Sequence, residues 1–361
     1  MGVFSQSKTA VQKRRRRHEN MSKRIIFCAD GTWDDPESAT NVFGLFNGIT
    51  ISSNQIAYYD TGVGSDGTPL EQSTGGAFGE GIFQKIKDGY TKIAHVYNQD
   101  DEIFIFGFSR GAYTARSLAG MIAVCGLPTA DPTDALVADA FQAYRNKDQR
   151  AAFQAKYPAI YDAKIRMVGV WDTVGSLGIP AIFGDVDMAI YGFLDTNLHP
   201  DVLNAYQALS IDERRQEFPP TLWTPPSPAV PGQTLEQVWF SGVHCDVGGG
   251  NPDTGLANIT LSWMINKAKN LGLQLKDGFL AEYLSMDALF ALDTIDDPWS
   301  PKWLFPKRRT VPDNAHIANS VAIRCQYDTT YRPVNLKQND QNDGTLADSY
   351  KKVTVVEPPP V

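Results

Sequence analysis

The chain has 361 residues, of which 42% are hydrophobic and 20% are charged, so it can bury a substantial core and is not disordered throughout. The chain has 33 lysines and arginines and 41 aspartates and glutamates. The resulting net charge of −8 excludes a protein whose overall charge attracts nucleic acid. The four cysteines form no C-x-x-C pair, which favours neither a zinc site nor a disulfide framework and fits a reducing compartment.

A run of basic residues lies near the N-terminus. Residues 13–17 read KRRRR and no apolar region follows them, so they are not a secretory signal peptide. They form either a patch for nucleic acid or anionic lipid, or part of an unstructured extension. No stretch of the sequence approaches the ~18–20 consecutive apolar residues of a membrane-spanning helix. We expect residues 1–22 to be a disordered extension and the protein to be cytoplasmic. Export by a route that needs no signal peptide is the alternative to a cytoplasmic location.

Apolar runs and amphipathic helices alternate along the chain. Residues 24–29 and 55–60 are predicted strands, and the helical spacing of apolar residues over 78–99 predicts a helix. There follow, in order, a strand at 102–106, a helix at 110–124, strands at 164–171 and 235–243, and a helix at 256–271. This alternation is typical of a mostly parallel sheet with helices on both faces, so the predicted fold class is α/β.

The proline-rich stretch at residues 218–232 is predicted to be an extended connection within one domain, because its prolines prevent a helix. A motif that follows it is needed to complete the candidate site described below. We therefore predict one catalytic domain over residues 23–334 and a polar, partly disordered tail over residues 335–361.

The strongest motif is GFSRG at residues 107–111, where the predicted strand 102–106 meets the following helix. A G-x-S-x-G turn in this position holds its serine in a strained conformation with the hydroxyl exposed, and the glycines avoid collisions with neighbouring backbone. Ser109 is therefore the candidate nucleophile. A serine that only caps the helix would not explain the two glycines.

A serine hydroxyl needs a base, and with this turn the order along the chain is serine, acid, histidine. His244 directly follows the predicted strand 235–243 and opens the sequence HCDVGGG, which we expect to be a flexible loop at the strand's carboxyl end, where ligands bind in such sheets. His316 is the main alternative, and His199 lies beside a proline in a polar connection.

The candidate acid is Asp172, which ends the predicted strand 164–171 and lies between the serine and the histidine in the sequence. An aspartate that only stabilises a turn is the alternative interpretation. Asp246 is the nearest rival for the role, although its neighbours suggest that it holds the glycine loop.

Two further parts of the site can be predicted. An oxyanion hole needs two backbone donors, and the N–H of Arg110 follows from the turn, while Gly31 or Thr32 after the first strand is the candidate for the second. The apolar stretch after Asp172 is either a buried connection or a lid that binds the acyl group. Its candidate substrate-binding residues are Leu177, Ile179, Ile182 and Phe183.

Several motifs in this order resemble one known family. They are FCADGTW at 27–33, TNV at 40–42, GFSRGAY at 107–113, WDTVG at 171–175, IDERR at 211–215, FPPTLW at 218–223 and WFSGVHCDVGGG at 239–250. They resemble the α/β-hydrolase family that contains the catalytic domain of type VI secretion phospholipase effectors. The resemblance covers residues 24–324 and implies an α/β-hydrolase-like fold with a triad of Ser109, Asp172 and His244. Gln207 stands where many members have histidine, and Asp34 where asparagine usually follows DGTW.

Together these features predict a serine hydrolase that cleaves carboxylic esters, with lipid and phospholipid esters included, through an acyl-enzyme. A thioesterase or amidase with the same mechanism and a non-catalytic α/β-hydrolase scaffold that binds a ligand or partner are the alternatives. The motifs imply no metal and no organic cofactor. The expected partner is a small-molecule or lipid ester, with peripheral membrane contact in the lipid case, and no nucleic acid is expected.

Overall fold

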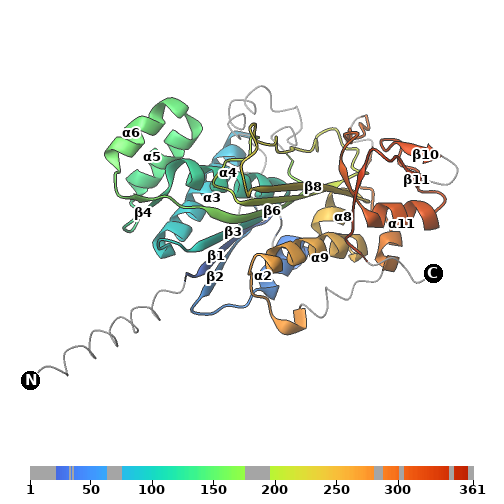
Figure 1. Cartoon of the computed structure of the whole chain (residues 1–361), viewed down its shortest axis with the longest axis horizontal. Helices are drawn as coiled ribbons and strands as arrows, with labels where there is room; N and C mark the ends of the chain where they lie inside the picture. The colour runs from blue at the N-terminus through green and yellow to red at the C-terminus, as the bar shows by residue number, and fades with distance from the viewer. Residues whose placement is uncertain are drawn as a thin grey trace, which may run out of the picture.

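A computed structural model of the chain describes residues 22–31, 34, 36–62, 75–174, 196–279, 288–300, 305–340 and 345–356 (Figure 1). Its centre is an eight-stranded sheet in the order β12-β9-β8-β7-β6-β3-β1-β2, in which every neighbouring pair is parallel. Its strands are β1 (Arg24–Ala29), β2 (Gln55–Asp60), β3 (Glu102–Phe108), β6 (Ile165–Trp171), β7 (Asn204–Ser210), β8 (Thr234–Phe240), β9 (His316–Ala318) and β12 (Lys351–Val353). Two short antiparallel pairs join β4 (Leu127–Pro128) to β5 (Ile160–Tyr161) and β10 (Gln338–Asp340) to β11 (Thr345–Leu346).

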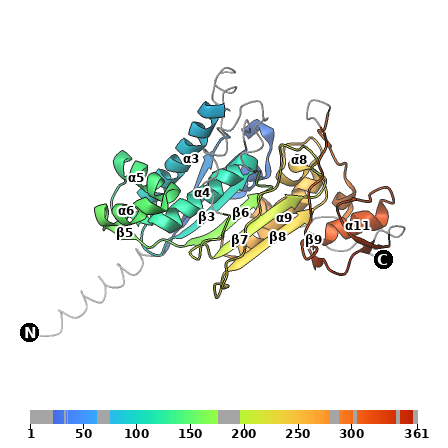
Figure 2. The ribbon, with the colours of Figure 1, turned by 90° about the horizontal axis from the view of Figure 1, so that it is seen from above.

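Helices cover both faces of the sheet (Figures 1 and 2). On one face lie α3 (Gly75–Val96), α4 (Ser109–Cys125), α5 (Asp134–Arg145) and α6 (Arg150–Lys156). On the other lie α2 (Asn41–Gly48) and α9 (Gly255–Asn270), while α8 (His244–Gly248) follows β8 and α11 (Asn319–Tyr327) follows β9. The described residues include the 3-10 helices η1 (Pro36–Ser38), η3 (Lys147–Gln149) and η6 (Ala288–Leu292). Within the described residues, no helix combines the length and the apolar character needed to cross a membrane.

The apolar strands explain the two-faced architecture. In β1, Ile25 and Phe27 pack with the apolar cluster beneath α3 and α4, whereas Ile26 and Cys28 pack with the cluster beneath α2 and α9. Side chains alternate along a strand, so a run of apolar residues without polar interruption buries both faces of the sheet at once. The predicted α/β fold class is confirmed.

The predicted strands and helices all form, with ends shifted by a few residues. The sequence HCDVGGG, predicted to be a flexible loop, instead begins with α8, because the Asp246 carboxylate accepts a hydrogen bond from the Val243 N–H at 2.9 Å and closes its first turn. Residues 218–232 contain no helix and no strand of the main sheet. Beyond residue 334, β12 pairs with β9 at the edge of the sheet, and Leu336, Leu346 and Tyr350 are buried, so the described part of this segment packs onto the sheet.

The parallel arrangement brings four strand ends to one edge of the sheet. Phe108 at the end of β3 pairs with Trp171 at the end of β6, and β1 ends beside them at Ala29, which pairs with Gly107. Figure 2 shows β3, β6, β7 and β8 side by side in that order. Ser109, Asp172 and His244 all follow strands that end at this edge.

Candidate active site

Ser109 occupies a sharp turn between β3 and α4. It is the first residue of α4, and its φ of 56° lies in the left-handed region that L-residues rarely adopt. Four described residues other than glycine have a positive φ, and two of them are Ser109 and Asp172, the latter at 40°. Strain of this kind persists only where surrounding contacts enforce it, and it concentrates at functional sites.

The glycines on either side of Ser109 are fixed by close approach of the backbone. A Cβ on Gly107 would lie 2.4 Å from the carbonyl oxygen of Gly111, and a Cβ on Gly111 would lie 2.2 Å from that of Ala29. Both distances are far below van der Waals contact, so α4 packs this closely against β1 and β3 only with glycine at both positions. The physical reason for the G-x-S-x-G spacing is therefore present at this turn.

Asp172 and His244 are joined by a hydrogen bond. The His244 Nδ1 lies 2.6 Å from Asp172 Oδ2, and both side chains are almost fully buried. An ionised carboxylate only accepts hydrogen bonds, so a neutral imidazole in this pair carries its proton on Nδ1 and leaves Nε2 as the acceptor. The ring of Phe108, the residue before Ser109, lies 4.6 Å from the imidazole centroid to centroid, which places His244 next to the end of β3.

Arg309 neutralises the buried charge of Asp172. Its two terminal nitrogens donate to the two carboxylate oxygens at 2.6 and 2.9 Å, and it is only 6% exposed. Arg309 also donates to the carbonyl oxygens of Ser210 and Phe218, while the Ser210 N–H donates to Asp172 Oδ1 at 3.0 Å. Arg309 and Asp172 thus form a bidentate ion pair, which fixes the orientation of the carboxylate plane.

These contacts decide the charge states of the pair. Burial alone would raise the pKa of Asp172, but the guanidinium of Arg309 and the hydrogen bond from His244 outweigh it and hold that pKa well below its usual range. Burial lowers the pKa of His244, with partial opposition from the carboxylates of Asp172 and Glu213. At neutral pH the site therefore holds an aspartate anion and a neutral imidazole able to accept a proton.

A second buried ion pair supports His244 from the other side. Glu213 is 1% exposed, binds Arg215 through both carboxylate oxygens at 2.9 and 2.7 Å, and accepts a hydrogen bond from the His244 backbone N–H at 3.3 Å. The Arg215 guanidinium stacks on the ring of Phe218 at 3.8 Å, and that ring meets the imidazole edge-on at 5.1 Å. The imidazole is thus held between two aromatic rings, those of Phe108 and Phe218.

The rival residues have other surroundings. His316 lies on β9, where it pairs in register with Val238 and where the charges that act on it come from Lys351, Glu236 and Lys267. His199 pairs with Asp201 at 3.4 Å. The Asp246 carboxylate accepts hydrogen bonds from the Val243 N–H and from Asn251 within its own loop.

The predicted oxyanion hole and substrate wall are only partly described. A Cβ on Gly31 would lie 3.3 Å from the Ser109 Cβ, so the turn after β1 lies beside the serine, but the Gly31 N–H donates to the Asp30 carboxylate at 2.8 Å. Thr32 lies outside the described residues, as do the predicted substrate-binding residues Leu177, Ile179, Ile182 and Phe183. The roles of all of these residues, and of the Arg110 N–H, stay predictions.

A parallel sheet with a strained serine at the strand–helix turn, and with an aspartate and a histidine after neighbouring strands, defines an α/β-hydrolase-like protein. Residues 23–267 match the family described as "T6SS, Phospholipase effector Tle1-like, catalytic domain", and the chain belongs to this family. The resemblance noted from the motifs is thereby confirmed, and the family points to lipase or phospholipase chemistry.

Two individual proteins are similar to the chain. An uncharacterized protein of Saccharomyces cerevisiae is 30% identical over 244 residues, which cover 59% of this chain and 34% of that protein. The chain therefore corresponds to about a third of that relative's length. The crystal structure of an uncharacterized protein from Pseudomonas aeruginosa aligns at 17% identity and a TM-score of 0.45, over 78% of this chain and 51% of that one.

Proposed function

We propose that the protein is a serine hydrolase that cleaves carboxylic esters of lipids through an acyl-enzyme intermediate, with Ser109, His244 and Asp172 as its triad. The observation that carries the proposal is the 2.6 Å contact between His244 Nδ1 and Asp172 Oδ2, formed beside a serine with a φ of 56°. Family membership supports the lipid ester as the substrate class.

In the first half of the proposed reaction, Ser109 Oγ attacks the ester carbonyl while His244 Nε2 accepts the hydroxyl proton. The carbonyl oxygen becomes an anion, and the backbone N–H of Arg110, the residue after the nucleophile, would stabilise it. The tetrahedral intermediate then collapses, the C–O bond to the alcohol breaks, and His244 returns its proton to the leaving oxygen. The acyl group is now bonded to Ser109.

In the second half, His244 takes a proton from water, and the resulting hydroxide attacks the acyl carbon. The Ser109 Oγ–carbon bond breaks, His244 gives the proton back to Ser109, and the carboxylic acid leaves. Asp172 stays ionised throughout, because Arg309 stabilises its anion, and it stabilises the imidazolium each time one forms.

The test is hydrolysis of acyl esters of increasing chain length, with a diacyl phospholipid included, by the wild-type protein and by Ser109→Ala. We expect turnover that depends on Ser109 and an optimum in chain length. Serine-independent turnover contradicts the proposed mechanism. If no ester reacts, matched thioester and amide substrates separate a related acyl hydrolase from a scaffold that only binds.

A further inference from the structure

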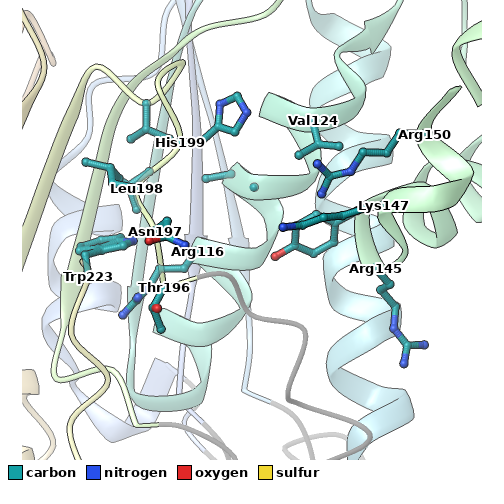
Figure 3. A pocket seen from close by; sticks show the side chains of 15 residues that line it. Arg116, Val124, Arg145, Lys147, Arg150, Thr196, Asn197, Leu198, His199 and Trp223 are labelled. Atoms are coloured by element: carbon teal, nitrogen blue, oxygen red, sulfur yellow. The ribbon is translucent and has the colours of Figure 1, made fainter. Parts of the chain in front are cut away.

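A cavity separate from the triad lies against the helical face of the sheet that α4 and α5 cover (Figure 3). Its volume is about 520 Å³, within the range of pockets for small molecules. Five of its lining residues are basic, and none of its described lining residues carries a carboxylate. The basic residues are Arg116, Arg145, Lys147, Arg150 and His199. In a protein with a net charge of −8, this is a local concentration of positive charge.

Arg116 is the deepest of these charges and is only 4% exposed. It donates to the carbonyl oxygen of Thr221 at 2.6 Å and more weakly to Gln207, it stacks on the Trp223 ring at 4.2 Å, and its Nε has no hydrogen-bond partner. All of these partners are neutral. Among the described residues, Arg116 has no counter-charge, and a buried cation in that state is costly, so a ligand that supplies an anion is favoured.

Burial lowers the pKa of Arg116 to about 9, which still leaves the guanidinium charged at neutral pH. The charge that the cavity presents is therefore permanent under physiological conditions, and it is not removed by loss of a proton.

The opposite wall supplies two more cations. Figure 3 shows Lys147 and Arg150 across the cavity from Arg116, Asn197 and Trp223. Lys147 comes from η3 and is exposed, while Arg150 opens α6 and donates to the carbonyl oxygen of Ala143 at 3.3 Å. Within the described chain, Lys147 and Arg150 form no ion pair.

The rest of the lining combines polar groups, from Tyr144, Thr196 and Asn197, with an apolar part. Ala119 and Val124 come from α4, and Val168, Leu198 and Val202 come from β6 and the segment before β7. Val202 precedes β7, so the cavity extends toward the amino ends of the strands, whereas the triad lies at their carboxyl ends. The cavity thus offers cations from two walls and an apolar surface for an organic group.

We infer that this cavity is a second binding site, which takes an organic phosphate with its phosphate group between Arg116 and the pair Lys147 and Arg150. A phosphate has enough oxygens to engage cations on opposite walls, whereas a carboxylate is satisfied by one guanidinium. A phospholipid headgroup and a soluble phosphate ester share this chemistry. The inference does not depend on the proposed hydrolase activity.

The test measures binding to the full chain carrying Ser109→Ala, so that no hydrolysis interferes. Calorimetry at fixed ionic strength uses glycerol 3-phosphate, with hexanoate as the carboxylate probe. Sedimentation with vesicles of phosphatidylglycerol, and of phosphatidylcholine as the neutral reference, tests the headgroup. The variant is Lys147→Gln with Arg150→Gln, and the matched control is Lys269→Gln with Lys352→Gln, which removes two exposed charges elsewhere.

We expect the cavity variant to bind the phosphate probe at least about tenfold more weakly, and the control to bind within about twofold of the parent. If the cavity variant binds glycerol 3-phosphate more weakly in calorimetry, the ligand is a soluble phosphate ester. If it binds only the phosphatidylglycerol vesicles more weakly, the ligand is a phospholipid headgroup. Arg116→Lys, which keeps the positive charge but lacks the planar guanidinium, should also bind the phosphate probe more weakly. The inference is overturned if neither phosphate probe distinguishes the cavity variant from the control, or if hexanoate binds more tightly than both.

Discussion

Replacing Arg309 by glutamine tests whether the ion pair with Asp172 sets the charge state of the site. The substitution removes the guanidinium that contacts both oxygens of a carboxylate with no exposed surface. Loss of one partner from a buried ion pair costs about 3–5 kcal/mol of unfolding free energy. In a domain of this size, that corresponds to a fall in Tm on the order of 10 °C.

The same substitution has an effect on pH dependence that a purely structural role would not produce. Arg309 and His244 both contact Asp172 Oδ2, so the guanidinium lies close to any imidazolium that forms and destabilises it. At an effective dielectric constant of about 20 and a separation of roughly 5–6 Å, this repulsion is at most about 3 kcal/mol. Without Arg309, the repulsion is removed, so the pKa of His244 rises and the acid limb of the kcat/KM profile moves toward higher pH.

The assay is the pH dependence of kcat/KM for a soluble ester, together with thermal unfolding of each variant. Arg309→Lys keeps the charge and should retain most of the wild-type pH profile. Arg308→Gln, an exposed neighbour, is the matched control and should change neither measurement. A wild-type pH profile and Tm in Arg309→Gln would refute the assignment of Arg309 as the positioning residue of Asp172.

The remaining predictions concern the turn and the histidines. Gly111→Ala places a Cβ 2.2 Å from the Ala29 carbonyl oxygen and should lower the free energy of unfolding by about 3 kcal/mol, measured in urea; a loss below 1 kcal/mol would show that the turn relaxes. Ser109→Gly should be about 1 kcal/mol more stable than Ser109→Ala, because only glycine accepts a φ of 56° without strain, and equal stability contradicts this. His316→Gln should retain wild-type kcat/KM, whereas His244→Gln should lose it by at least about 10³-fold; the reverse pattern would exchange the two roles. Since burial lowers the pKa of His244, its stabilising effect is complete above the unfolded pKa of 6.5 and is lost as pH falls through the folded pKa, so His244→Gln should flatten the decline in stability below pH 6.5.

The sequence was sufficient for five of the eight strands of the central sheet, β1, β2, β3, β6 and β8, because these are short apolar runs bounded by turn residues. β1 and β3 bury both faces, and such runs are recognisable without any knowledge of their neighbours. β7 was missed although all of its residues are buried, because Asn204 and Gln207 interrupt its apolar pattern. Gln207 is accommodated by hydrogen bonds to Thr173 and to the carbonyl oxygen of Thr221, which lie in other parts of the chain.

The same contrast applies to the candidate site. Ser109, Asp172 and His244 each follow a predictable strand, so the order of residues alone is enough to place them at one edge of the sheet. Arg309 could not be placed in this way, since it lies 137 residues from its partner in a segment with no helix or strand. An arginine in such a segment has no local pattern that distinguishes it from a solvated one. Glu213 and Arg215 lie in the IDERR motif at residues 211–215. The reason for their presence is visible only in the structure, where both are buried and Glu213 contacts His244.

The position of Arg309 along the chain also has a consequence for synthesis. Residues 23–267 include all three residues of the proposed triad, yet the cation that balances Asp172 is added more than 40 residues later, as is β12, which ends the sheet. While the ribosome is still completing the chain, the aspartate would be buried without its counter-ion, a state that is costly enough to keep the site open. We therefore expect nascent chains that end before residue 309 to lack the proposed hydrolytic activity, which would appear only after Arg309 has been added.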